Sequence, residues 1–478
     1  MNGLIYTLDS SFSQVEAMAV KDGKVVAIGS SEALRHSYRA PQELNLKGQV
    51  VYPGFNDAHA HFYGYAQSLI QVNLVGTRSY QEVLNRTQAF AKEHQPKFIS
   101  GRGSDQTDWG TVQFPHRKAL DSLFPKTPVL LKRIDGHAAL ANQAALDFAG
   151  IKADTSVPGG VLMKQNGRLT GVLIDRAVDL VQFPETPTTK KSQAIRWAQD
   201  SLLKYGLTSV TDAGLNLEQI QLIEKLQEAG QLRLRINAMV SDTPELLEHF
   251  LERGMIKNDR LKVQCFKFYL DGALGSRGAL MLRPYADDSL NYGLSLTGEA
   301  HFKEALASLK TARWQAAVHA IGDSANRQVL NLYKEILGDA TKMDHRWRVE
   351  HAQVVHEDDV ARFGEIGAIP SVQPTHATSD MYWAEQRLGA AGMEEAYPYK
   401  DLLAAAGVLP LGTDFPVEDI DPRKTFRAAV FRQDSASFPV GGFRPEQRLT
   451  REQTIRGMTI WGAYASFEEE QKGSLRAR

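Results

Sequence analysis

The 478-residue sequence predicts an α/β protein built around a TIM-type (β/α)8 barrel. Short apolar strands alternate with amphipathic helical stretches from Val51 onward, which is the pattern of parallel sheets. Eight such strands are present, and eight parallel strands separated by helices close most simply into a barrel. With 43% hydrophobic and 23% charged residues, the chain has the balance of a globular protein with a sizeable core.

The first fifty residues predict a small β-domain, over residues 1–50. Its strand patterns are LIYTLD, AMAVKDGKVVAIG and LNLKGQVVYPGF. Asp22 and Gly23 form a typical hairpin turn within the second pattern. The chain begins at MNGLIYTLD, already inside a strand pattern. One interpretation is that an upstream leader has been removed.

The barrel is predicted over residues 51–435. Its strands are VVYPGFND, LTSVTDAG, LRLRINAMV, VQCFKFYLD, QAAVHAIGD, RWRVEHAQ, AIPSVQP and VLPLGTDFP. Between them lie helical patterns such as LEQIQLIEKLQEAG and SANRQVLNLYKEIL, with apolar residues three to four apart. A long insertion, about residues 73–190, follows the first strand, where it can cover an active site at the C-terminal face. Residues 436–478 predict a C-terminal helical segment and the start of a truncated return to the β-sandwich.

Composition excludes several classes of function. The 55 basic and 56 acidic residues give a formal charge of -1, which argues against nucleic-acid and acidic-membrane partners. The single cysteine, Cys265, excludes an internal disulfide and a cysteine-based metal cluster. No apolar run reaches membrane-spanning length and no signal-peptide layout is present, so we expect a cytoplasmic protein.

Two histidines, His59 and His61, follow the apolar lead-in of the first barrel strand in PGFNDAHAHF. Strand residues alternate faces with a period of two, so both imidazoles point the same way and can hold one ion. A lone buried histidine is more often a core residue with satisfied hydrogen bonds than a ligand. A preorganised pair, however, favours a metal.

Other polar residues end the later strands. They are Lys267 and Asp271 on the fourth strand, His319 on the fifth, His351 on the sixth and Asp414 on the eighth. Barrel enzymes carry their catalytic groups at this end. The pattern therefore predicts a divalent metal held by side chains that lie far apart in the sequence.

Lys267 is the unusual member, because a buried ammonium group is costly. Desolvation lowers the pKa of a lysine, and its neutral amine can capture carbon dioxide as a carbamate. The two carbamate oxygens can bridge two divalent metals as a carboxylate does. The alternative is an ion pair between Lys267 and Asp271, which face the same side at strand spacing.

The strings PGFNDAHAH, FKFYLDGALGSRGAL, VHAIGDSANR, RVEHAQ, SVQPTHATSD and GTDFPV occur in this order and resemble the amidohydrolase superfamily. The resemblance is to its amidohydrolase 3 group, which includes YtcJ-like proteins and N-substituted formamide deformylase. It implies a TIM barrel with a small composite β-sandwich and one or two divalent metals, for which zinc is the best match. It further implies that His59, His61 and Asp414 bind the more buried metal, that carboxylated Lys267 bridges, and that His319 and His351 bind a second metal.

Two features depart from this group. The chain stops at KGSLRAR, before the strands that usually complete the sandwich, and Ser104 stands where many relatives carry tryptophan.

The predicted reaction is hydrolysis of a carbon–nitrogen bond in an amide, formamide or cyclic amide. A metal would activate the attacking water, and Asp414 would act as general base and then as acid toward the leaving nitrogen. Candidate substrate contacts are His137, Asp271, His376, Trp109 and Tyr269. For each of these, a loop hydrogen bond or aromatic packing is the alternative.

Two other functions remain open. The same binuclear site suits lactone, ester or phosphotriester hydrolysis, and fold alone does not separate these chemistries. The second alternative is that the chain is a non-catalytic relative with a metal-binding or regulatory role. The expected partner is a small-molecule substrate, and apolar outer helices leave a homo-oligomer open.

Overall fold

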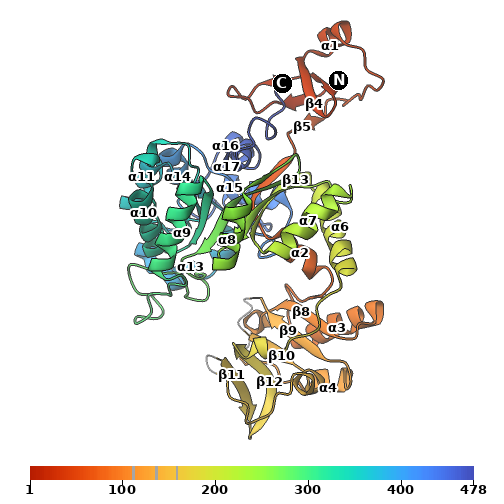
Figure 1. The fold of residues 1–478 in the computed structure, drawn as a ribbon, viewed down its shortest axis with the longest axis vertical. Coiled ribbons are helices and arrows are strands. Elements are labelled where there is room, and N and C mark those ends of the chain that lie inside the picture. The colour runs from red at the N-terminus through yellow and green to blue at the C-terminus, as the bar shows by residue number, and fades with distance from the viewer. Residues whose placement is uncertain (110–112, 135–137, 158–159, 478) are drawn as a thin grey trace. The chain divides into compact units, whose positions relative to one another are not determined.

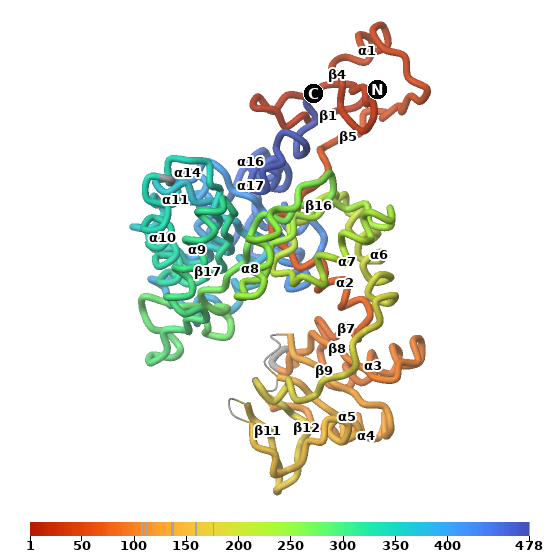
Figure 2. The backbone as a smooth tube through the Cα atoms, in the orientation of Figure 1, coloured from red at the N-terminus to blue at the C-terminus, as the bar shows by residue number. Residues whose placement is uncertain are grey.

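The computed structural model describes residues 1–109, 113–134, 138–157 and 160–477 (Figure 1). The chain divides into two compact units, which Figure 2 traces from the N-terminus to the C-terminus. Unit 1 comprises Met1–Tyr63 and Gln199–Arg478, and unit 2 comprises Gly64–Ala198. Among the described helices, none combines the length and apolarity that crossing a bilayer requires.

Seven parallel strands form the central sheet of unit 1, which confirms the predicted α/β barrel. Their order is β19-β18-β17-β16-β14-β13-β6. The bounds are β6 (Phe55–Ala60), β13 (Leu207–Leu215), β14 (Arg235–Ser241), β16 (Leu261–Tyr269), β17 (Gln315–Ala320), β18 (Arg348–His351) and β19 (Ile369–Ser371). The short strand β15 (Ile256–Lys257) pairs antiparallel with β16.

The predicted eighth strand is an irregular segment that joins β19 to β6. Leu411 forms a parallel bridge with Val372, just after β19. On its other side, Leu411 O accepts from Ala58 N at 3.2 Å, and Asp414 N donates to His59 O at 2.8 Å. Because Pro410 lacks an N–H donor, a regular ladder is interrupted here. The segment nevertheless delivers Asp414 to the end of β6.

Some helices of unit 1 begin at typical capping residues. Asn216 forms a capping box at the start of α7, and Thr243 caps α8, which has proline in its first turn. The barrel helices are α7 (Leu217–Glu228), α8 (Pro244–Arg253), α9 (Glu299–Ala312), α10 (Asp323–Leu337), α11 (Glu357–Ile366), α12 (Pro374–Asp380), α13 (Ala384–Met393), α14 (Tyr399–Ala406) and α15 (Pro422–Phe431), with the 3-10 turn η3 (Gly338–Lys342). Figure 1 shows α8 to α11 beside the strands, against which their apolar faces pack.

The N-terminal strands form two small sheets. One has the order β2-β1-β5, and the other is the β3–β4 hairpin, whose turn residues Asp22 and Gly23 both have positive φ. The bounds are β1 (Leu4–Tyr6), β2 (Gln14–Val15), β3 (Ala17–Lys21), β4 (Lys24–Gly29), α1 (Ser31–Ser37) and β5 (Val50–Val51). The C-terminal elements are η4 (Pro445–Gln447), α16 (Arg451–Gly457) and α17 (Ile460–Ala465). Beyond α17, the chain returns to the N-terminal strands, where Leu475 N donates to Thr7 O at 2.7 Å.

Unit 2 has its own mixed sheet, in the order β11-β12-β10-β9-β8-β7, and its own core of residues such as Leu74, Ile99 and Leu120. Its strands are β7 (Val72–Asn73), β8 (Ile99–Ser104), β9 (Val129–Arg133), β10 (Ala138–Ala141), β11 (Gly160–Gln165) and β12 (Arg168–Asp175). Its helices are α3 (Tyr80–His94), η1 (Gln106–Trp109), α4 (Lys118–Leu123), α5 (Gln143–Phe148) and η2 (Val178–Leu180). Helices α2 (Phe62–Ser68) and α6 (Thr188–Lys204) span the boundaries with unit 1.

Candidate functional site

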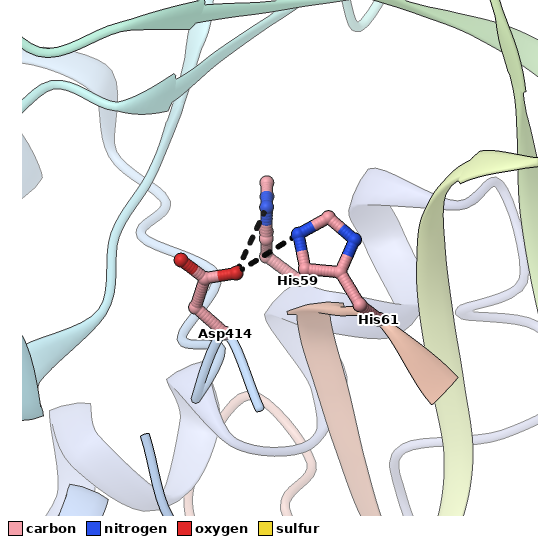
Figure 3. Close-up of side chains that lie close together, drawn as sticks. All are labelled: His59, His61 and Asp414. Carbon is pink, nitrogen blue, oxygen red and sulfur yellow. Dashed lines mark ion pairs between the residues drawn. The ribbon is translucent and has the colours of Figure 1, made fainter. Parts of the chain in front are cut away.

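The C-terminal ends of the barrel strands bring the predicted ligand residues together. His59 lies on β6 and His61 directly follows it, while Asp414 arrives on the irregular closing segment (Figure 3). His61 Nε2 lies 3.2 Å from Asp414 Oδ1, and His59 Nε2 lies 3.7 Å from the same oxygen. Near the C-terminal ends of three further strands lie Lys267 on β16, His319 on β17 and His351 on β18. The ring of His351 lies 4.8 Å from that of His59 and 4.4 Å from that of His319.

The geometry of the first three residues fits a divalent cation. One ligand atom from each of His59, His61 and Asp414 lies within 4.8 Å of the other two. Ligands about 2.1 Å from a tetrahedral zinc are roughly 3.4 Å apart, close to the distances observed here. Asp414 Oδ1 is buried and makes no hydrogen bond to any described residue, although His61 Nε2 is so near. The ring nitrogens of both His59 and His61 therefore lie around this one carboxylate oxygen.

Close backbone approach fixes Asp414 at this point. At Gly412, a Cβ atom would lie 2.6 Å from His59 N, so only glycine allows the closing segment to approach β6. Asp414 itself has φ +62°, and His351 has φ +74°. Such left-handed conformations cost about 1–3 kcal/mol at a residue other than glycine, and they cluster at functional sites.

Each of three histidines is anchored through its Nδ1 atom. His59 Nδ1 lies 2.5 Å from Glu350 Oε2, His61 Nδ1 lies 2.9 Å from Ala213 O, and His351 Nδ1 lies 2.8 Å from Gln373 Oε1. Such partners orient metal ligands and fix their tautomers. Sequence reasoning missed Glu350 and Gln373. Glu350 has a recognisable signal, since Arg348 and Glu350 share one face of a buried strand.

Lys267 is fully buried on β16, and its Nζ lies 3.4 Å from His59 Nε2 and 4.8 Å from the centre of the Tyr269 ring. Desolvation lowers the pKa of Lys267 to about 8. No ion pair forms between Lys267 and Asp271 among the described residues. Tyr269 is 39% exposed beside His319, at a ring separation of 5.5 Å, so its ring is available to a ligand.

Asp271 holds the backbone at the strand ends. Its buried carboxylate accepts from Leu280 N, Ile321 N and Gly322 N at 2.9–3.0 Å. Burial raises the pKa of Asp271 to about 7 despite these bonds. Its Oδ1 lies 3.6 Å from His319 Nε2, which has no hydrogen-bond partner among the described residues. Burial also lowers the pKa of His319 to about 3.

His376, on α12, joins the site from the loop side. Its Nε2 lies 3.2 Å from Asp414 Oδ2, and its Nδ1 lies 3.4 Å from Glu418 Oε1. Burial alone lowers the pKa of His376, but hydrogen bonds to these two carboxylates outweigh burial and raise it well above the ordinary value. Ligand atoms of His351, His376 and Asp414 also lie within 4.8 Å of one another.

The remaining candidates lie in unit 2. Trp109 donates from Nε1 to Thr77 O at 2.9 Å and stacks near Tyr80, so its observed contacts are structural. Ser104 ends β8. His137 falls outside the described residues. The roles of His137, Trp109, Asp271, His376 and Tyr269 as substrate contacts stay predictions.

A strand-end histidine and aspartate cluster in a parallel barrel is the architecture of a metal-dependent hydrolase. The sequence model of the amidohydrolase family matches residues 42–478, so the chain belongs to that family. The resemblance inferred from the sequence is thereby confirmed.

Several relatives match nearly the whole chain. It is 31% identical to protein LONG AFTER FAR-RED 3 of Arabidopsis thaliana, over 99% of this chain and 84% of that protein. It is 30% identical to the putative amidohydrolase YtcJ of Bacillus subtilis, over 99% of this chain and 91% of that protein. It is 24% identical to N-substituted formamide deformylase of Arthrobacter pascens, over 100% of this chain and 91% of that protein.

A solved structure shares the fold. It is an uncharacterized metal-dependent hydrolase of Pyrococcus horikoshii, 28% identical, with a TM-score of 0.84 over 99% of this chain and 94% of that one.

Proposed function

We propose that this protein hydrolyses a carbon–nitrogen bond in an amide, formamide or cyclic amide, with a divalent cation held by His59, His61 and Asp414. The observation that carries the proposal is the convergence of these three ligand residues, from opposite ends of the chain, at one position. The names of the amidohydrolase YtcJ and of N-substituted formamide deformylase support this bond class. Zinc suits two imidazoles and a carboxylate best.

A divalent cation bound there supplies a Lewis acid and a water whose pKa is lowered to about 7. Asp414 divides its tasks between its two oxygens. Oδ1 faces His59 and His61, while Oδ2 lies on the His376 side. We assign Oδ2 the proton of the attacking water. As the carbon–oxygen bond forms and the carbon–nitrogen bond breaks, Asp414 passes this proton to the leaving nitrogen.

The predicted carbamate at Lys267, with His319 and His351 as ligands of a second cation, stays a two-ion alternative to the one-ion mechanism proposed above. The burial of Lys267 and the lack of a described carboxylate partner support this prediction, since an unpaired buried ammonium group is unfavourable. Tyr269 provides an exposed aromatic wall for an apolar substituent of the substrate.

The decisive experiment compares zinc-loaded wild type with Asp414→Asn. Its substrates are formamides, N-acyl amino acids, hydantoins, lactones and phosphotriesters. We expect turnover of a carbon–nitrogen substrate, lowered about 10²–10⁴-fold in Asp414→Asn at full metal loading. Asp323→Asn is the matched control, because among the described residues this buried carboxylate accepts from Leu282 N and Ser324 N, away from the proposed ligands. Full activity in metal-replete Asp414→Asn would refute the base role.

The same panel tests the other functions. Turnover of lactones or phosphotriesters alone would replace the proposed bond class. A zinc-loaded protein without any turnover would favour the regulatory alternative. The name of the relative LONG AFTER FAR-RED 3 denotes no enzyme, which is compatible with the regulatory alternative.

A further inference from the structure

His376 has the same arrangement as the three anchored histidines of the site. Its Nδ1 faces an outer acceptor, Glu418 Oε1, at 3.4 Å, and its Nε2 faces the centre. Glu418 is itself held in place, because Ser379 Oγ donates to the same oxygen at 2.6 Å. An outward nitrogen bonded to a carboxylate, with the other nitrogen aimed inward, is the usual setting of a metal-ligating imidazole. From the sequence, His376 is expected to contact the substrate.

The two oxygens of Asp414 face two different groups. Oδ1 lies 3.2 Å from His61 Nε2, and Oδ2 lies 3.2 Å from His376 Nε2. Each separation is close to the roughly 3.4 Å expected between two ligands of one zinc ion. His351 completes the second group, with its Nδ1 already bonded to Gln373. One carboxylate thus stands between two sets of histidines.

We propose that His351, His376 and Asp414 Oδ2 form a second divalent-cation site, whose occupation inhibits the enzyme. A cation there takes up the oxygen that the proposed mechanism needs as its base. The binding part stands on geometry alone, and the inhibition rests on the proposed function. This ligand set differs from Lys267, His319 and His351, which the family resemblance implies for a second metal.

The number of groups gathered around His376 favours a cation over a simple ion pair. The side chains of His376 and Asp414 are only 12% and 8% exposed. An ion pair between them needs neither a third ligand atom from His351 within 4.8 Å nor an outer anchor on every imidazole. A three-ligand cation site uses all of these features.

The first test is the number of bound ions. Metal-free wild type and His376→Ala are titrated with Zn²⁺ by calorimetry, and the bound zinc is counted by elemental analysis after dialysis. We expect two classes of site in the wild type. In His376→Ala the tighter ion should remain, while the second binds at least about 100-fold more weakly, since even an outer partner of a ligand is worth 10–100-fold.

Two further variants keep the test sound. Glu418→Gln leaves His376 in place and should weaken only the second ion, about 10-fold. His94→Ala is the histidine control, because His94 is 42% exposed on α3 in unit 2. In a zinc-soaked crystal of the wild type, an anomalous peak should lie about 2.1 Å from His376 Nε2.

The outcomes separate the two proposals. A wild type that binds no zinc contradicts the proposed function itself. Two ions in His376→Ala with wild-type affinity, or a second anomalous peak beside Lys267 and His319, would overturn the His376 site while leaving the proposed function intact. With a turned-over substrate, the rate should peak near one equivalent of zinc and fall as the second site fills. A rate that rises to two equivalents would overturn the inhibitory role.

Discussion

Glu350 is the buried charge on which both stability and the candidate metal centre depend. It lies in the barrel with no exposed surface and accepts from Arg348 Nε at 2.6 Å and Arg348 Nη2 at 3.1 Å. Its Oε2 also lies 2.5 Å from His59 Nδ1. Replacing Glu350 with alanine therefore leaves a buried guanidinium without its counter-charge, and it releases the ring of a predicted ligand.

The size of the loss follows from the bonds that disappear. Arg348 keeps Ala58 O and Ser371 Oγ as acceptors but loses two charged hydrogen bonds, each contributing about 1.5–3 kcal/mol. Breaking a buried ion pair from one side costs about 3–5 kcal/mol, in agreement with that sum. We expect Glu350→Ala to lose this much unfolding free energy. The double variant Arg348→Met/Glu350→Met should lose less, because no unpaired charge remains.

The assay is urea unfolding of the metal-free protein, with hydrogen exchange assigning the transition to unit 1. Zinc affinity, measured by chelator competition, should fall about 10–100-fold in Glu350→Ala because His59 loses its anchor. Glu452→Ala is the control, since Glu452 pairs with Arg456 on the surface, where such a pair contributes at most about 1 kcal/mol. If Glu350→Ala unfolds within about 1 kcal/mol of wild type, the reasoning is wrong.

Three further predictions concern other parts of the chain. Burial raises the pKa of Asp380 to about 6, so the folded protein retains a proton that the unfolded chain releases near pH 4. Stability relative to Asp380→Asn should therefore fall by up to about 1.4 kcal/mol per pH unit from pH 4 to 6 in urea unfolding, and parallel curves would contradict this. Gly412→Ala should displace His59 and lower both zinc affinity and the melting temperature, whereas unchanged zinc binding would exclude the close contact. Trp109→Phe removes the donor to Thr77 O and should destabilise unit 2 by about 1 kcal/mol in hydrogen exchange; a raised KM without this loss would instead support substrate contact.

The barrel was predictable because strand and helix periodicities are local properties. Seven of the eight predicted strands form the parallel sheet. The eighth resisted prediction as a ladder because Pro410 interrupts hydrogen bonding and Asp414 needs positive φ. Its apolar pattern still marked the segment that completes the sheet, since burial against β19 and β6 selects the same residue types as a regular strand.

The candidate site was predictable to the extent that strand ends converge in a parallel barrel. This rule alone placed His59, His319 and Asp414 near one another, without any knowledge of loops. The rule does not predict the residues that orient the ligands, such as Glu350, which contacts His59 although the two are 291 positions apart in the sequence. Such a contact depends on the register between distant strands, and that register leaves no trace in a local pattern.

His376 shows where the strand-end rule is too narrow. It lies five residues beyond β19, in a helix that Pro374 begins, and sequence reasoning therefore treated it as a loop residue. A helix that starts directly at a strand end, however, projects its first turn over the same face as the strand residues. His376, in the first turn of this helix, thereby contacts Asp414 Oδ2, the oxygen to which the proposed mechanism assigns the proton of the attacking water. The Zn²⁺ titration of His376→Ala therefore asks whether ligand prediction in this barrel must include the first helical turn as well as the strands.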